Sequence, residues 1–232
     1  MKKLFSILII ACILTFISAS AEVEPYNWQD QIAVGDKVDW RSILQHYRND
    51  DDTRQLIFVK YTSGTECEVQ IYLKDTKENN AWTKALVCDG LVGRNGAGLT
   101  HEGGGRTPLG VYGVSTAFGI KSNPGTTMPY IDVTPTIFCC DEDTEYYNTI
   151  IDLNEVDHDC HGEEMFKYSP EYNYGMFMDY NKECTPGKGS AIFFHCDGAR
   201  DYTGGCVAVS EENMKWILQN CDSGVKVCVF SK

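Results

Sequence analysis

A histidine and a cysteine near the C-terminus have residue types and a local context suited to nucleophilic catalysis. His195 ends an apolar run, and Cys206 follows Gly204 and Gly205. The two glycines permit a sharp turn and leave bare backbone N–H groups beside the sulfur, which a thiol nucleophile and its oxyanion hole require. The histidine comes before the cysteine, whereas papain-like peptidases have the opposite order. The sequence therefore predicts a thiol nucleophile at Cys206, exposed by its turn and alkylated faster than the other cysteines.

Other patterns lack the spacing that their chemistry needs. The segment Gly105-Arg106-Thr107 has neither the lysine nor the first glycine of a phosphate-binding loop, and Gly93–Gly98 has the wrong spacing for a dinucleotide. His158, Cys160 and His161 could begin a zinc site, but a second ligand pair is not evident. We therefore predict no metal site and no organic cofactor.

Several blocks of sequence resemble one known family. His195 followed by Thr203-Gly204-Gly205-Cys206-Val207 resembles the His…Ser/Thr-x-Gly-Cys signature of the L,D-transpeptidase catalytic domain, the YkuD-like family. The similarity runs from about Gln55 to the C-terminus. Further blocks that are similar to one branch of the family are Val92–Gly96, Glu102–Tyr112, Tyr174–Asn181 and Gly187–Ser190.

The resemblance implies a β-sandwich enzyme that forms 3–3 cross-links between peptidoglycan stem peptides. Cys206 would attack the carbonyl of an L-configured diamino acid and expel D-alanine, with His195 as base and later as acid. The N–H groups of Gly204, Gly205 and Cys206 are the oxyanion-hole candidates. Two alternatives stay open: an L,D-carboxypeptidase or endopeptidase on the same fold, and a non-catalytic wall-binding protein whose Cys206 is in a disulfide.

The sequence departs from the family pattern at two positions. Many members have arginine where this chain has Ala208, so Arg94 and Arg200 are candidates to replace it. Together with Thr203 they are the predicted substrate-binding residues. Many members also have glycine or serine after the histidine, where this chain has Cys196. A backbone carbonyl could still orient the imidazole there, while Cys196 adds a redox alternative.

The elements that must position these residues are mostly short strands. Ser210 is a good N-cap for one helix, and an apolar stripe on that helix includes Cys221, which should be buried and slow to react. A second short helix is predicted around Trp40–Tyr47, and residues 141–173 are predicted to be a long irregular insertion. These features predict a mainly β fold with a few short helices in a single domain. The predicted strands lie at Leu56–Val59, Val69–Leu73, Trp82–Val87, Val111–Ala117, Tyr174–Tyr180, Ser190–His195 and Val225–Phe230.

Composition and the N-terminus limit the possible partners and location. The 232 residues have a formal net charge of −13, so the chain lacks the cationic surface that nucleic acid or an anionic membrane would attract. Lys2 and Lys3, an apolar run and Ala19-Ser20-Ala21 predict an export signal over residues 1–21, followed by an extension over 22–54 and a catalytic domain over 55–232. The alternatives are a retained anchor or a lipoprotein modified at Cys12. We expect the mature protein in the cell envelope, the periplasm or outside the cell, free of the membrane. The eleven cysteines predict a mixture of bridges and free thiols, and the sequence predicts no oligomeric state.

Overall fold

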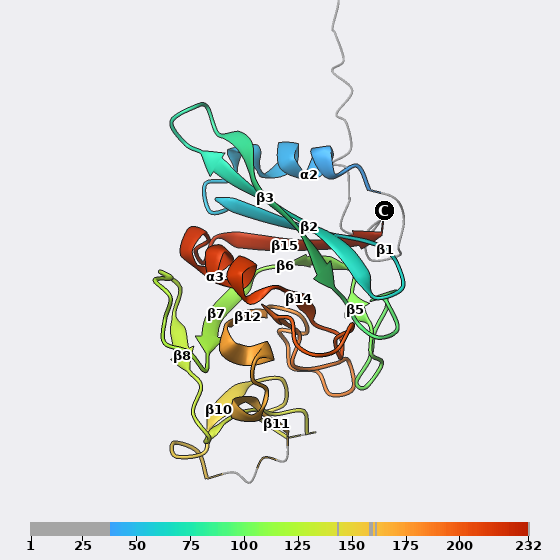
Figure 1. The fold of residues 1–232 in the computed structure, drawn as a ribbon, viewed down its shortest axis with the longest axis vertical. Coiled ribbons are helices and arrows are strands. Elements are labelled where there is room, and N and C mark those ends of the chain that lie inside the picture. The colour runs from blue at the N-terminus through green and yellow to red at the C-terminus, as the bar shows by residue number, and fades with distance from the viewer. Residues whose placement is uncertain (1–37, 143, 158–159, 161, 232) are drawn as a thin grey trace, which may run out of the picture.

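The computed structural model describes residues 38–142, 144–157, 160 and 162–231 (Figure 1). The predicted signal over residues 1–21, and the predicted extension as far as residue 37, lie outside the described residues. Within the described ranges, the helices lack the combination of length and apolar character that crossing a membrane requires.

Ten strands form one large mixed sheet, in the order β6-β15-β1-β2-β3-β14-β13-β12-β7-β8. The two short α-helices are α2 (Trp40–His46) and α3 (Glu211–Asn220). This confirms the predicted mainly β, single-domain architecture. The sheet strands are β1 (Gln55–Ser63), β2 (Glu66–Asp75), β3 (Ala81–Leu91), β6 (Gly110–Tyr112), β7 (Val114–Gly119), β8 (Tyr130–Asp132), β12 (Gly175–Met178), β13 (Phe193–Cys196), β14 (Val207–Val209) and β15 (Val225–Ser231).

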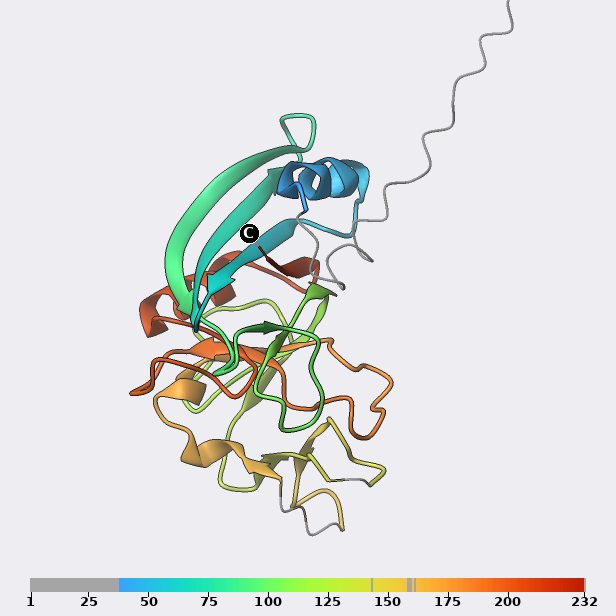
Figure 2. The same ribbon diagram turned by 90° about the vertical axis from the view of Figure 1, so that its right-hand side faces the viewer.

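The sheet curves so that its two halves share one core. Figure 2 shows β2 and β3 arching over the strands that lie below them. Ile57 and Val69 from one half are fully buried in the same cluster as Met176 and Val207 from the other half. Helix α3 adds its apolar stripe to that cluster, with Ile217 fully buried. The apolar faces of the strands therefore pack against one another as in a sandwich, because each strand must bury one face.

The local signals of the sequence are mostly confirmed. The hairpin of β1 and β2 turns at Gly64 and Thr65, between the paired Ser63 and Glu66, and the Ser210 hydroxyl caps α3 by accepting a hydrogen bond from the Asn213 N–H at 3.3 Å. The single strand predicted over Val111–Ala117 is wrong, because the chain is split at Gly113 into β6 and β7. A side chain at Gly113 would lie 2.7 Å from an Asp179 carboxylate oxygen, and the two strands pair with different partners, β15 and β12.

Parallel strands β13 and β14 place the two reactive residues next to each other. His195 of β13 is in register with Ala208 of β14, and Cys206 immediately precedes β14. Strand β13 begins at Phe193 rather than at the predicted Ser190, since Ala191 has a left-handed φ of 52°. The Asn148 side chain accepts a hydrogen bond from the Ala191 N–H at 3.0 Å and so supports that conformation.

The insertion over residues 141–173 is more ordered than predicted. It contributes to a small three-stranded sheet in the order β10-β9-β11, formed by β9 (Ile137–Cys139), β10 (Ile150–Asp152) and β11 (Glu163–Glu164). A disulfide joins Cys140 to Cys160. The short 3₁₀ helices η2 (Met165–Lys167) and η3 (Glu171–Asn173) follow and lead back to β12. Eight other described cysteines are free, which confirms the predicted mixture of bridges and thiols.

Helix α2 packs against the outer face of the large sheet. Ile43 is fully buried there with Phe58 of β1 and Phe230 of β15, and Trp40 stacks edge-on against Phe58. The predicted helix around Trp40–Tyr47 is therefore confirmed. The sheet has a second apolar layer on this side, made by residues that precede the start of β1.

Candidate active site

The turn that carries Cys206 is held by two threonine hydroxyls. Thr203 Oγ1 donates to the Cys206 carbonyl at 2.7 Å, and Thr107 Oγ1 donates to the same oxygen at 2.9 Å. Thr203 Oγ1 also accepts a hydrogen bond from the Gly205 N–H at 3.1 Å. Gly205 has a φ of 149°, and a side chain there would lie 3.1 Å from the Arg106 carbonyl. This position therefore needs glycine, and the turn has one well-defined conformation.

The Cys206 thiol is buried and hydrogen-bonded within this turn. Its relative exposure is 7%, its S–H donates to the Ala191 carbonyl at 3.2 Å, and the Phe193 N–H donates to the sulfur at 3.3 Å. Burial raises the pKa of Cys206 well above its usual range, and the nearby Glu163 carboxylate raises it further. The predicted exposure of this thiol is therefore wrong, and in the free protein both effects oppose formation of the thiolate.

His195 is oriented so that one ring nitrogen is available as a base. Its Nδ1 lies 2.7 Å from the Cys196 carbonyl oxygen, which can only accept, so Nδ1 carries the proton and Nε2 has the free lone pair. Burial lowers the pKa of His195 to about 4. The Cys196 thiol is fully buried and donates to the Tyr174 carbonyl at 3.4 Å, away from this arrangement. The resting site thus contains a neutral imidazole and a neutral thiol.

Two of the three predicted oxyanion-hole donors are available. The Gly205 N–H is engaged by Thr203, whereas the N–H groups of Gly204 and Cys206 have no hydrogen-bond partner among the described residues. Gly204 also has open space where a side chain would lie. The arrangement can therefore stabilise a negatively charged oxygen beside the Cys206 sulfur with two backbone donors.

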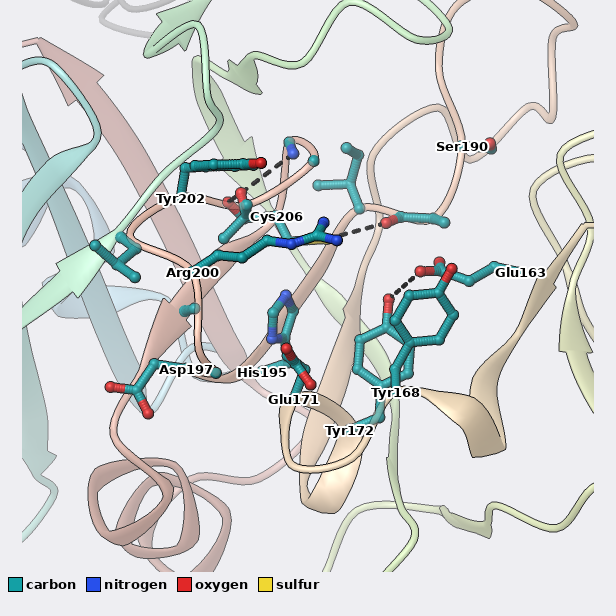
Figure 3. Close-up of a pocket in the computed structure, with 18 of the residues that line it drawn as sticks. Glu163, Tyr168, Glu171, Tyr172, Ser190, His195, Asp197, Arg200, Tyr202 and Cys206 are labelled. Atoms are coloured by element: carbon teal, nitrogen blue, oxygen red, sulfur yellow. Dashed lines mark hydrogen bonds between the residues drawn. The ribbon is translucent and has the colours of Figure 1, made fainter.

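A cavity of about 480 Å³ opens over these residues. Figure 3 shows the labelled side chains of His195, Cys206 and Arg200 around it, with Glu163 and Tyr172 joined by a hydrogen bond. Among the described residues, five carboxylic acids and one arginine line the cavity, so its walls are predominantly acidic. The acids are Glu102, Asp141, Glu163, Glu171 and Asp197, and the arginine is Arg200.

The structure separates the two arginines that were predicted to bind substrate. Arg200 lines the cavity, with its guanidinium 5.9 Å from the centre of the Tyr202 ring. The Arg94 side chain instead donates to the Gly103 carbonyl at 2.9 Å, outside the residues that line the cavity. The Arg94 backbone N–H donates to the Thr203 carbonyl at 2.9 Å, so Arg94 supports the base of the turn. Five of the predicted site residues line the cavity: Thr203, Gly204, Gly205, Cys206 and His195.

Sequence reasoning missed the contribution of the insertion and of Thr107. Glu163, Tyr168 and Glu171 line the cavity, and Tyr172 packs edge-on against the His195 ring at 5.3 Å between centroids. Residues 141–173 are rich in acidic and aromatic side chains, and that composition is the signal in the sequence for their place in the cavity wall. Thr107 lies within one of the family-like blocks, yet only the folded structure places its hydroxyl on Cys206.

The described residues contain no group of three or more potential metal ligands. His158 and His161 of the dismissed zinc pattern lie outside the described residues, and Cys160 is in the disulfide with Cys140.

Comparison with known proteins places this site in a family. No curated protein matches the sequence. A crystal structure of a mutant of the helical cell shape determining protein Pgp2 from Campylobacter jejuni is similar at 19% identity, with a TM-score of 0.42. The match covers 82% of this chain and 53% of that chain, so this protein spans about half the length of Pgp2. The model of the L,D-transpeptidase catalytic domain (YkuD) matches residues 65–229, which include every residue of the Cys206 turn and His195. The chain therefore belongs to the L,D-transpeptidase catalytic domain family, a family of peptidoglycan enzymes.

Proposed function

We propose that this protein is an L,D-transpeptidase that cleaves the L-diamino acid–D-alanine bond of a stem peptide and forms 3–3 cross-links through a Cys206 acyl-enzyme. The observation that carries the proposal is that the Cys206 turn, locked by two threonine hydroxyls, lines the same cavity as a His195 imidazole whose Nε2 is free. Family membership supplies the substrate class, peptidoglycan stem peptides.

Acylation starts from the neutral pair. The Cys206 S–H leaves the Ala191 carbonyl and gives its proton to His195 Nε2 while the sulfur attacks the donor carbonyl carbon. The negatively charged oxygen accepts hydrogen bonds from the N–H groups of Gly204 and Cys206. The protonated imidazole then donates its proton to the leaving amine nitrogen, the C–N bond breaks, and D-alanine departs from the thioester.

The lowered pKa of His195 determines the charge of the imidazole in the resting site. An imidazole with a pKa of about 4 is uncharged at neutral pH and can accept the thiol proton. Once protonated, it is a strong acid toward the leaving amine. The pair therefore needs no preformed thiolate, which agrees with the raised pKa of Cys206.

The alternative in which Cys206 is in a disulfide receives no support, since Cys206 is a free cysteine. Hydrolysis of the same thioester would make the protein an L,D-carboxypeptidase. Purified peptidoglycan incubated with the enzyme and then digested separates these outcomes by mass. Cross-linked 3–3 dimers would support transpeptidation, and tripeptides without such dimers would assign the carboxypeptidase activity instead.

The test of the mechanism follows D-alanine release and the mass of the acyl-enzyme with a tetrapeptide donor. Cys206→Ala should abolish both, and His195→Ala should lower the rate by at least about 10², because the thiol loses its base. Cys184→Ala is the matched control, since Cys184 is a free thiol outside the cavity lining. Undiminished turnover in Cys206→Ala would end the proposal.

Export is part of the proposal and rests on the sequence of residues 1–21. We propose that cleavage after Ala21 releases a mature protein that begins at Glu22, in the envelope, periplasm or medium. N-terminal sequencing of secreted protein tests this. A lipid-modified chain beginning at Cys12 would overturn it.

A further inference from the structure

Glu163 lines the active-site cavity, and only one of its two carboxylate oxygens is hydrogen-bonded within the described residues. Its Oε1 accepts a hydrogen bond from the Tyr172 hydroxyl at 2.6 Å, and its other oxygen has no hydrogen-bond partner among the described residues. Figure 3 shows Glu163 and Tyr172 on the same side of the cavity, with the Arg200 side chain extending in their direction. A partly buried carboxylate that keeps one oxygen free can bind a hydrogen-bond donor of the substrate.

The fold holds Glu163 close to the nucleophile. Glu163 pairs with Cys139 in the small sheet, and the Cys139 side chain is buried in the same cluster as Cys206. Gly162 brings the backbone against this strand, because a side chain there would lie 2.4 Å from the Cys139 carbonyl. The negative charge of Glu163 is also a direct cause of the raised pKa of Cys206. Glu163 and Cys206 therefore line the same cavity and interact electrostatically.

The other acids of the cavity are placed differently. Glu102 is fully engaged, since Oε2 accepts hydrogen bonds from the hydroxyls of Tyr147 at 2.5 Å and Ser190 at 2.8 Å, and Oε1 accepts from the Gly103 N–H at 3.2 Å. Glu171 lies against Gly198, where its carboxylate oxygen occupies the space that a side chain would need. The Asp141 carboxylate repels the charge of Glu163, and the Tyr172 hydroxyl donates one hydrogen bond to it.

Transfer to an amine poses a proton problem that hydrolysis does not. A primary alkylamine has a pKa of about 10.4 and enters the site as an ammonium ion. It must lose one proton before its nitrogen can attack the thioester and a second proton to become an amide. His195 can accept one of these. A second base beside the nucleophile would accept the other directly from the bound ammonium.

We propose that Glu163 binds the ammonium group of the acceptor amine and takes its first proton. This inference rests on the proposed acyl transfer and names the residue that selects an amine as the acceptor. The ammonium N–H breaks and the Glu163 carboxylate becomes a carboxylic acid. The free amine nitrogen attacks the thioester carbonyl, the C–S bond breaks, and the electron pair goes to the Cys206 sulfur. His195 Nε2 takes the second proton and passes it to the thiolate, while Glu163 returns its proton to water.

The electrostatics of Glu163 fit this role. Burial raises its pKa to about 7, and the Asp141 carboxylate adds to the effect. A base is most effective when its pKa lies near the operating pH. The predominance of carboxylates in the cavity also favours a cationic group there over an anionic one.

The experiment uses two nucleophiles that differ in charge. The full-length protein is acylated with the tetrapeptide donor at neutral pH and treated with hydroxylamine, which is mainly uncharged, or with Nα-acetyl-lysine amide, which is an ammonium ion. Glu163→Gln should lower transfer to the lysine derivative by about 10², the lower range for loss of a general base. Acyl-enzyme formation and transfer to hydroxylamine should not fall, because neither step uses Glu163 as a base and loss of its charge removes one cause of the raised pKa of Cys206.

The variants and controls distinguish this role from a structural one. Glutamine can still accept the Tyr172 hydrogen bond, and Glu163→Asp should restore part of the transfer to the lysine derivative. Glu164→Gln is the matched control, because this neighbouring acid pairs with Lys167 and does not line the cavity. Equal losses with both nucleophiles, or no loss with the lysine derivative, would overturn the inference while leaving the acyl-enzyme intact. Failure to form any acyl-enzyme in the wild type would overturn the proposed function itself.

Discussion

The hydroxyl of Thr203 is hydrogen-bonded to two consecutive residues of the turn that carries Cys206: it donates to the Cys206 carbonyl at 2.7 Å and accepts from the Gly205 N–H at 3.1 Å. Because Thr203 engages the Gly205 N–H in this way, only the N–H groups of Gly204 and Cys206 are left for the oxyanion of the proposed mechanism. Thr203 is therefore a positioning residue rather than a group that contacts the reacting atoms.

Thr203→Val should lower kcat for D-alanine release by about 10 to 10², because a small misplacement of reacting groups has effects of this size. KM for the donor should change little, since the cavity walls are kept. Thr203→Ser retains the hydroxyl and should keep most of the activity. Steady-state kinetics of the three proteins tests this. A pure KM effect in Thr203→Val would instead show that the hydroxyl binds substrate.

The opposed pKa shifts of His195 and Glu163 make opposite contributions to the dependence of stability on pH. The folded pKa of His195 is about 4, below its ordinary 6.5, so its contribution to stability is lost as the pH falls through that range. The folded pKa of Glu163 is about 7, above its ordinary 4.5, so its contribution is lost as the pH rises. Each shift corresponds to about 3 kcal/mol over its range, and between pH 4.5 and 6.5 the two effects oppose each other.

Single variants should expose the two contributions. The free energy of unfolding of Glu163→Gln should fall more steeply toward acid than that of the wild type. That of His195→Gln should instead rise toward acid. Urea unfolding between pH 4.5 and 6.5 measures both. Parallel curves for the wild type and both variants would contradict the shifts.

Cysteine reactivity should follow exposure rather than catalytic role. Brief treatment of the free protein with iodoacetamide at neutral pH should modify the partly exposed Cys184 before Cys206, which is 7% exposed and has a raised pKa. Cys221, whose pKa burial raises to about 12, should be slow as well. Peptide mapping gives the order. Modification of Cys206 ahead of Cys184 would mean that the thiolate forms without substrate.

Arg200 and Arg94 should differ in their effect on donor binding. Arg200→Ala should raise KM for a donor that ends in a carboxylate by about 10-fold, the size of one charge-assisted hydrogen bond. Arg94→Ala, which removes a bond to the Gly103 carbonyl outside the cavity lining, should leave KM unchanged. A larger effect of Arg94→Ala would restore Arg94 as the substitute for the arginine absent at Ala208.

The sequence was sufficient for the parts of the site that depend on local chemistry. The Gly204-Gly205 turn, the His195 strand and the Ser210 cap are short-range patterns, and the structure has each of them. Glu163 could not be predicted in the same way, because its position depends on pairing between β11 and β9 and on the contact of Gly162 with Cys139. The exposure of Cys206 was mispredicted for a related reason. Glycines beside a thiol expose it only if no distant segment covers it, and here Cys206 is buried in one cluster with Tyr172, Phe193 and Cys139.

The position of β15 in the sheet has a consequence for biosynthesis. This strand, the last of the described chain, lies between β6 and β1 and is parallel to β1, where Gln55 is opposite Val225. A nascent chain that has left the ribosome only as far as α3 has no partner for that edge of β1, and Phe58 lacks the Phe230 ring against it. Folding of the large sheet must therefore wait for the final residues of β15, and until then an exposed strand edge is open to aggregation and to holding factors.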